Sequence, residues 1–254
     1  MKKLVAAMLC LALSLMCAVG LANEKIDPSE LQIGVIMIGD TSDMGFNYSH
    51  LVGLQEMQKN LGIEDRQITI LENVADDSTC ADAISELISN GCNVIIGNSF
   101  GFQTYMYEAA AQHPEVLFCH YSGLLQNDTN FCRFNARNYQ TRYLQGIAAA
   151  MRSESGKIGF VGAFKNAEVN VSLNAYALGA QSVNPDVTVY VKYTNSWYDP
   201  DGETAAANAL IDLGCDVICQ YVNTTGPQTA AQERGVQLRH LRRVCAHGAD
   251  GRPR

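Results

Sequence analysis

Apolar and polar positions follow one another in blocks along the chain, and the blocks repeat at a regular spacing. Short apolar runs rich in β-branched residues, such as residues 33–38, are typical of strands buried on both faces of a parallel sheet. Longer stretches with helical periodicity follow them, and in residues 47–60 one face carries Leu51, Leu54 and Met57. This alternation predicts parallel sheets with crossover helices.

The pattern places eight strands and at least six helices. The predicted strands cover residues 33–38, 67–71, 93–96, 116–120, 131–134, 157–162, 188–193 and 217–222. The predicted helices cover residues 47–60, 80–89, 102–112, 139–152, 168–182 and 201–213, and another begins at residue 228.

One short internal match favours two similar halves. Residues 87–95 resemble residues 210–218, and each segment leads from a helix end, through a glycine suited to a left-handed cap, into a buried strand. Because turns between helices and strands look alike in many proteins, the match alone proves little. Together with the restarted rhythm, it predicts two α/β domains over residues 23–153 and 154–235.

The N-terminal segment has the pattern of a secretory signal peptide. Two lysines precede an apolar stretch over residues 4–19, and small residues predict cleavage after Ala22, so that 1–22 is removed. The stretch is short for a membrane span, which disfavours the alternative of an anchor helix. Cys17 is a poor site for a lipid, because Met16 stands where a small residue is usual. We expect an exported protein, in the periplasm or at the outer face of the cytoplasmic membrane.

Charge and cysteine content narrow the function. A net charge of −8 argues against a nucleic-acid binder, which would present a basic face, and against attachment to an anionic membrane. The cysteines are widely spaced and show no zinc pattern, but export permits disulfides, and Cys119 and Cys132 could pair across a short connection. No phosphate-binding, dinucleotide-binding or nucleophile motif is present, so neither an enzyme nor a cofactor is predicted.

The last residues break the pattern. From Arg234 onward there are six arginines and no lysine, and the apolar periodicity stops. With three predicted strands, the second sheet would keep open edges. One hypothesis is that residues 236–254 are a frameshifted or misassembled end, which leaves the second domain incomplete. The alternative is a natural basic tail that binds a partner.

Parallel sheets bind ligands at the carboxyl ends of their strands, so each strand-to-helix turn is a candidate site. After the first strand, Phe46 could stack on a flat ligand while Asp43 and Asn47 hydrogen-bond its edge. With equal weight, Asp43 caps the helix and Phe46 belongs to the core. After the third strand, Asn98 and Ser99 stand in a glycine-flanked turn that either admits a ligand or is a plain loop.

The turn over residues 195–200 holds the chain's only tryptophan, Trp197, together with Asp199. A tryptophan among polar loop residues is often a binding platform. The alternative is that it packs beneath the helix that Pro200 helps to start. Phe46 from one domain and Trp197 from the other suggest a sandwich that closes on a planar ligand by a hinge.

These turns, in this order, resemble the basic membrane protein family. The resemblance rests on residues 35–47, 95–114, 136–149 and 195–200, and it covers about 31–235. The family comprises substrate-binding proteins of ABC importers, including purine nucleoside receptor lipoproteins, with the type I periplasmic-binding-protein fold of two doubly wound parallel-sheet domains and a hinge. The resemblance implies a purine nucleoside or similar ligand, an ABC permease as partner, and no catalysis or cofactor.

The resemblance also implies roles for single residues. Phe46 matches the aromatic residue that stacks on the purine, Trp197 matches the one on the opposite face, and Asp43 and Asn47 lie in the first motif. In the family, ribose is held mainly by charged residues further along, in a part that lies beyond this chain. The helix after the third strand often carries an acidic residue that contacts the base, whereas Thr104 stands near that position here.

Two other functions stay open from the sequence. The same fold serves receptor domains that pass their closed form to a signalling partner. A neighbouring kinase gene would favour that function, and a neighbouring permease and ATPase would favour transport. The third function is an exported enzyme that processes nucleosides, which a release of free base dependent on Asp43 would reveal.

Overall fold

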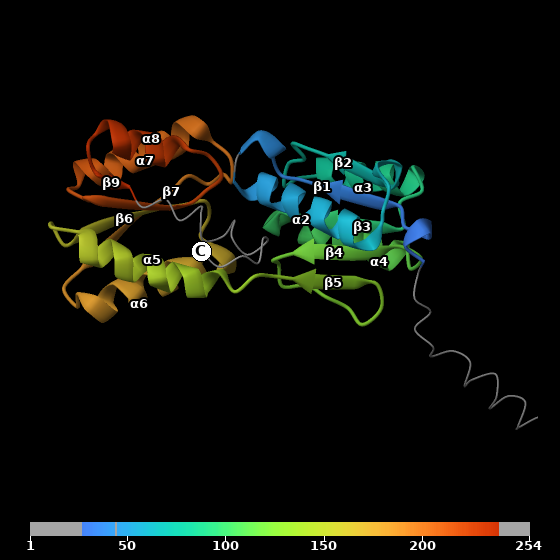
Figure 1. Ribbon diagram of the computed structural model, residues 1–254, viewed down its shortest axis with the longest axis horizontal. Coiled ribbons are helices and arrows are strands. Elements are labelled where there is room, and N and C mark those ends of the chain that lie inside the picture. The colour runs from blue at the N-terminus through green and yellow to red at the C-terminus, as the bar shows by residue number, and fades with distance from the viewer. Residues whose placement is uncertain (1–26, 44, 239–254) are drawn as a thin grey trace, which may run out of the picture.

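The computed structural model describes residues 27–43 and 45–238, which form two lobes lying side by side (Figure 1). Each lobe is built on a parallel β-sheet with helices on both of its faces. This is the doubly wound α/β architecture that the alternation of strands and helices predicts.

The first sheet has the strand order β2-β1-β3-β4-β5, and all neighbouring strands are parallel. Its strands are β1 (Ile33–Ile36), β2 (Ile68–Leu71), β3 (Val94–Gly97), β4 (Leu117–Tyr121) and β5 (Phe131–Phe134). Its helices are α2 (Phe46–Leu61), α3 (Thr79–Ser89) and α4 (Gln103–Gln112). The strand order reverses between β1 and β3, so the carboxyl ends of these two strands flank the crevice where such sheets bind ligands.

Strand β1 is buried along its whole length, which explains why its sequence shows no polar alternation. On one face of the sheet, Val35 packs with Leu54 of α2. On the other face, Ile36 packs with Leu87 of α3. A Cβ atom added at Gly34 would come within 2.8 Å of the Leu87 side chain, so the glycine lets α3 lie close to the sheet.

The second sheet has the order β7-β6-β8-β9 and is also parallel throughout. Its strands are β6 (Lys157–Gly162), β7 (Thr188–Tyr193), β8 (Val217–Tyr221) and β9 (Gln237–Leu238). Its helices are α5 (Asn138–Arg152), α6 (Ala167–Val183), α7 (Pro200–Asp212) and α8 (Gly226–Glu233). The first four strands of the two lobes therefore follow the same order.

The internal sequence match reflects this shared topology. Residues 87–95 lead from α3 into β3, and residues 210–218 lead from α7 into β8, the third strand of each lobe. The φ angles of Gly91 and Gly214 are 85° and 90°, so both glycines adopt the left-handed conformation expected at the end of a helix.

The prediction of three strands in the second lobe was wrong. Strand β9 pairs in parallel with β8, and Val236 packs against the hydrophobic core of this lobe. Residues 236–238 therefore belong to the fold and not to the tail predicted over 236–254. A strand of two residues is too short to show apolar alternation, which is why the pattern did not reveal it.

The boundary between the lobes lies earlier than the predicted position after residue 153. Residues 135–137 connect β5 of the first lobe to α5. Helix α5 packs against α6, and Ala149 and Ala150 lie in the core of the second lobe. The amphipathic pattern of a helix shows that one face is buried, but it does not show which sheet covers that face.

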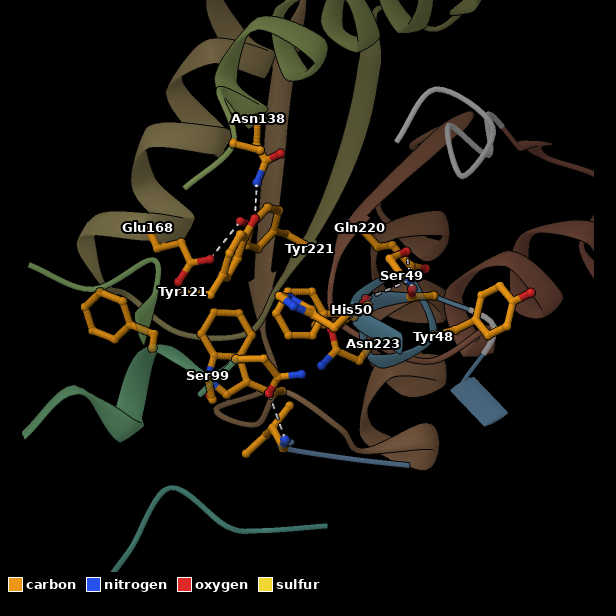
Figure 2. A pocket seen from close by; sticks show the side chains of 18 of the residues that line it. Tyr48, Ser49, His50, Ser99, Tyr121, Asn138, Glu168, Gln220, Tyr221 and Asn223 are labelled. Atoms are coloured by element: carbon orange, nitrogen blue, oxygen red, sulfur yellow. Dashed lines mark hydrogen bonds between the residues drawn. The ribbon is translucent and has the colours of Figure 1, made fainter. Parts of the chain in front are cut away.

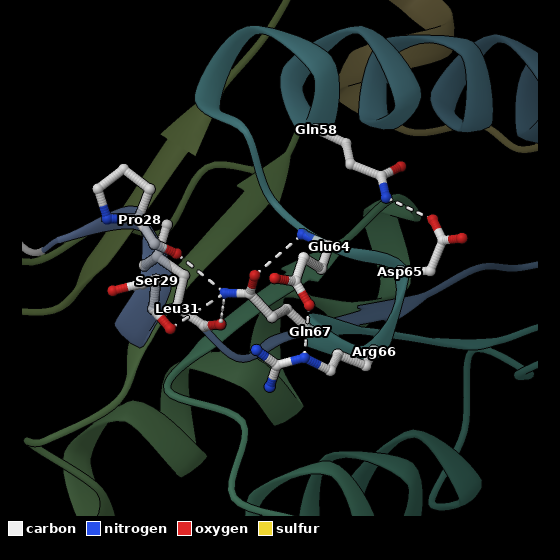
Figure 3. Close-up of polar contacts among 8 residues, drawn as sticks. All are labelled: Pro28, Ser29, Leu31, Gln58, Glu64, Asp65, Arg66 and Gln67. Carbon is white, nitrogen blue, oxygen red and sulfur yellow. Dashed lines mark hydrogen bonds and ion pairs between the residues drawn. The ribbon is translucent and has the colours of Figure 1, made fainter.

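The segment before β1 is fastened by one buried amide, that of Gln67 (Figure 3). Its Nε2 donates to the carbonyl oxygens of Pro28 at 2.9 Å and Leu31 at 2.7 Å. Its Oε1 accepts the backbone N–H of Glu64 at 2.9 Å. These bonds tie the segment that leads into β1 to the turn before β2.

Cys119 and Cys132 lie opposite one another on β4 and β5, with their sulfur atoms 3.4 Å apart. Both are free thiols, so their disulfide stays a prediction. The predicted signal peptide over residues 1–22 lies outside the described residues. Within residues 27–43 and 45–238, no helix has the length and apolar character that crossing a membrane requires.

Candidate functional site

A cavity of about 460 Å³ lies between the two lobes. The first lobe lines it with the start of α2, the turn after β3 and the end of β4. The second lobe lines it with α5, the start of α6, the turn after β7 and the end of β8 (Figure 2). The cavity thus lies at the carboxyl ends of strands from both sheets, and its volume is in the range of small-molecule sites.

Three rings form an aromatic cluster on the first-lobe wall. Phe46 and His50 lie one helical turn apart on α2, with ring centroids 4.7 Å apart, and Tyr121 contacts them at 5.7 and 4.8 Å in edge-to-face geometry. Burial lowers the pKa of His50 to about 4, although the nearby Asp43 carboxylate opposes this shift. The imidazole is therefore neutral at pH 7, and the cluster presents an uncharged surface.

The turn after β3 brings Asn98 and Ser99 to the cavity wall, where both were predicted. The Asn98 side chain accepts the backbone N–H of Ile38 at 3.0 Å and donates to Oδ1 of Asn47 at 2.8 Å. The Ser99 hydroxyl donates to Asp76 at 3.1 Å. Both side chains are therefore held by the first lobe, and they give the wall a fixed polar surface.

The Asp76 carboxyl lies beside this turn, where it accepts the Ser99 hydroxyl. Burial raises the pKa of its carboxyl, while hydrogen bonds from Ser99, Trp197 and the backbone of Gly101 favour the ionised form. Trp197 belongs to the second lobe, so side chains of both lobes affect the pKa of Asp76.

Asp43 caps helix α2. Its carboxylate accepts the backbone N–H groups of Gly45, Asn47 and Tyr48 at 2.8, 2.9 and 3.0 Å, which otherwise lack partners at a helix start. Asn47 is fully buried, and its amide donates to the same carboxylate at 3.1 Å. Neither side chain lines the cavity; together they position Phe46, which does.

We expect Asp43→Ala to lower the free energy of unfolding by about 1–2 kcal/mol, because its carboxylate satisfies N–H groups at the helix start as an N-cap side chain would. Urea denaturation of the wild type and the variant measures this change. Asp43→Asn keeps an acceptor at the cap and should lose less stability. A variant as stable as the wild type would contradict the capping role.

The second-lobe wall carries two further aromatic side chains. The rings of Trp197 and Tyr221 have centroids 6.3 Å apart, and Phe164 supports Trp197 from 5.5 Å. The guanidinium carbon of Arg142 lies 4.7 Å from the centre of the Tyr221 ring, within range of a cation–π interaction. The Tyr221 hydroxyl donates to Oε1 of Glu168 at 3.0 Å (Figure 2).

Asp199 does not line the cavity, and its side chain caps a helix. It is the N-cap of α7 and accepts the backbone N–H of Gly202 at 3.0 Å. Thr104, at the position of the expected acidic residue, is exposed on α4 and does not line the cavity either. Of the predicted site residues, the cavity brings together Phe46, Asn98, Ser99 and Trp197, whereas Asp43, Asn47 and Asp199 lie outside its wall.

Several lining residues were missed from the sequence: His50, Tyr121, Asn138, Arg142, Glu168, Gln220 and Tyr221. Two signals could have found some of them. His50 stands one helical turn after Phe46 on the same helix. Glu168 opens the helix after the first strand of the second lobe, which is the same kind of turn as the one that carries Phe46.

Two doubly wound lobes and a cavity between them, with aromatic residues from both, define a solute-binding protein of the type I periplasmic-binding-protein fold. The family model for PnrA-like ABC transporter substrate-binding proteins matches residues 30–239, and the chain belongs to this family, Bmp, the basic membrane protein family. The family model describes proteins that bind the substrates of ABC transporters.

Two relatives share more than a third of their aligned residues with this chain. A purine-binding protein of Brucella abortus is 38% identical over 216 residues, which cover 85% of this chain and 60% of that protein. A Haloferax volcanii protein named for glucose binding in ABC transport is 38% identical over 202 residues, covering 79% and 50%. The chain thus spans half to three-fifths of the length of these relatives.

A solved structure supports the fold. The crystal structure of an ABC transporter solute-binding protein from Aeropyrum pernix superposes with a TM-score of 0.72 at 20% identity, covering 81% of this chain and 60% of that one.

Proposed function

We propose that this protein captures a purine, as free base or nucleoside, outside the cytoplasm and delivers it to the permease of an ABC importer. The observation that carries this proposal is the composition of the cavity wall. Phe46 comes from the first lobe and Trp197 from the second, so each lobe offers a ring to a planar ligand. Aromatic side chains stack on planar heterocycles whatever their substituents, since every base has a π-face.

Polar groups beside the rings fit the edge of such a ligand. Arg142, Glu168 and Gln220 line the cavity in the second lobe, and Asn98 and Ser99 line it in the first. Amide, hydroxyl and charged side chains of this kind orient a small molecule in its site. The purine-binding relative supports the same ligand class, whereas the relative named for glucose makes a sugar the principal competing ligand.

We expect adenine, guanine, hypoxanthine or their nucleosides to raise the unfolding temperature, and glucose to leave it unchanged. A ligand that binds only the native state stabilises it by RT ln(1 + [L]/Kd), which is about 2.7 kcal/mol at a hundredfold excess over Kd. Differential scanning fluorimetry with this panel, confirmed by calorimetric titration, makes the measurement. A shift with glucose and none with purines would assign the protein to sugar binding instead, and no shift with any compound would refute the proposal.

A further inference from the structure

The wall of the interlobe cavity carries few charges. Among its lining residues in the described chain, Glu168 is the only carboxylic acid and Arg142 the only guanidinium or ammonium group. Because burial lowers the pKa of His50 to about 4, the imidazole adds no charge at pH 7. With so few charged groups, each one has a large influence on which ligand the cavity accepts.

Arg142 is already engaged by its own lobe. Its Nη1 donates to Oε1 of Gln145 at 2.8 Å and to the carbonyl oxygen of Gln220 at 3.0 Å, while its guanidinium lies over the Tyr221 ring. The ion pairs found within residues 27–43 and 45–238 involve neither Arg142 nor Glu168. Tyr221 contacts both charged residues, but they form no ion pair with each other. The Glu168 carboxylate is therefore not neutralised by Arg142.

Glu168 is held in place and keeps the capacity to accept further hydrogen bonds. It lies in the first turn of α6, which Asn166 caps by accepting the backbone N–H of Val169 at 2.9 Å. The Tyr221 hydroxyl donates to one of its oxygens, and the Ser122 side chain also favours the ionised form, but a carboxylate offers about four acceptor positions. Burial raises the pKa of Glu168, so the donors of the protein do not fully replace the water that the charge loses.

We propose that Glu168 determines the specificity of the cavity by accepting a hydrogen bond from an N–H donor on the edge of the ligand, such as the exocyclic amino group of a purine. This inference rests on the proposed function, because it takes a purine-type ring as the ligand. A ligand amino group replaces the water that the partly buried carboxylate has lost. When the ligand ring lacks that group, the carboxylate has no hydrogen-bond donor in place of the lost water. The binding of that ligand is then weaker.

The test measures how strongly Glu168 is coupled to the amino group of the ligand. Adenine differs from unsubstituted purine in its 6-amino group, and guanine differs from hypoxanthine in its 2-amino group. For one of these pairs, we expect the amino group to improve wild-type affinity by roughly 10- to 150-fold, the range for a hydrogen bond to a charged partner. Calorimetric titration at fixed pH and salt gives the affinity ratio for each pair.

Two variants of Glu168 separate recognition from structure. Glu168→Met has a similar length and no strong acceptor, so it should bring the affinity ratio close to one. Glu168→Gln retains one acceptor oxygen and should give an intermediate ratio. A purely structural role would weaken both members of a pair equally and leave the ratio at its wild-type value, which would overturn the inference.

Asp201 provides the matched control. It is an exposed carboxyl in the first turn of α7, outside the cavity, and Asp201→Asn should leave every affinity unchanged. A wild-type protein that binds none of these bases would refute the proposed function, and this inference with it. A wild-type protein that binds them with a ratio independent of Glu168 would refute this inference alone.

Discussion

Gly179→Ala is expected to destabilise the second lobe by about 2–4 kcal/mol, because overpacking against rigid backbone is among the costlier single changes. A Cβ atom at Gly179 would lie 1.9 Å from the carbonyl oxygen of Tyr143 on α5, where real contacts are essentially never below 3.0 Å. Gly146 on α5 faces the carbonyl oxygen of Tyr176 on α6 at the same 1.9 Å. Since backbone atoms oppose each glycine, relief requires the two helices to separate.

Thermal unfolding measures this effect. For a protein of this size, such a loss should lower the unfolding temperature by roughly 5–15 °C. Gly53→Ala is the matched control, because Gly53 is exposed within α2 and no atom lies within 4 Å of an added Cβ. It should stabilise the protein by about 0.5–1 kcal/mol through the higher helix propensity of alanine. If Gly179→Ala were as stable as the wild type, the close packing of α5 on α6 would be wrong.

The helix crossing at Gly179 also explains why part of the site escaped the sequence analysis. Periodicity places a helix over residues 139–152 correctly, and the structure extends it by only one residue, to Asn138–Arg152. It does not reveal that this helix packs on the second lobe through glycine contacts distant in sequence. Because the sequence assigned α5 to the first lobe, it did not predict that Arg142 lines the cavity. The strands, helices and their parallel arrangement were accessible because each depends on local periodicity and buried apolar runs.

The turn after β1 shows that residue types alone do not predict which side chains reach a ligand. The sequence offers Asp43, Phe46 and Asn47 together, and residue type alone does not distinguish a capping carboxylate from one that binds a ligand. In the fold, the three backbone N–H groups that Asp43 accepts direct its carboxylate to the helix start, and Asn47 is enclosed between Asp43 and Asn98. Only Phe46 of the three reaches the cavity. Distinguishing these roles requires side-chain directions, which depend on the helix cap.

We expect Trp197→Ala to weaken the binding of purines by roughly 5- to 150-fold, which corresponds to the 1–3 kcal/mol that stacking one base on one aromatic ring contributes. Trp197 lines the cavity from the second lobe, and Phe164 and Tyr221 hold its ring by edge-to-face contacts. The indole is therefore rigid before a ligand arrives, and little side-chain entropy is lost on binding. Calorimetric titration with the purine that binds the wild type most tightly measures the loss.

Two further variants give this prediction its controls. Trp197→Phe keeps a ring on the wall and should lose less affinity than the alanine variant. Tyr198→Ala removes the neighbouring aromatic side chain, which is exposed and does not line the cavity, and should bind as the wild type does. Because Trp197 is the only tryptophan of the chain, its fluorescence in the wild type reports on the ligand directly. Unchanged affinity in Trp197→Ala would show that the second-lobe ring does not stack on the ligand, and the aromatic argument for a purine would then rest on the first lobe alone.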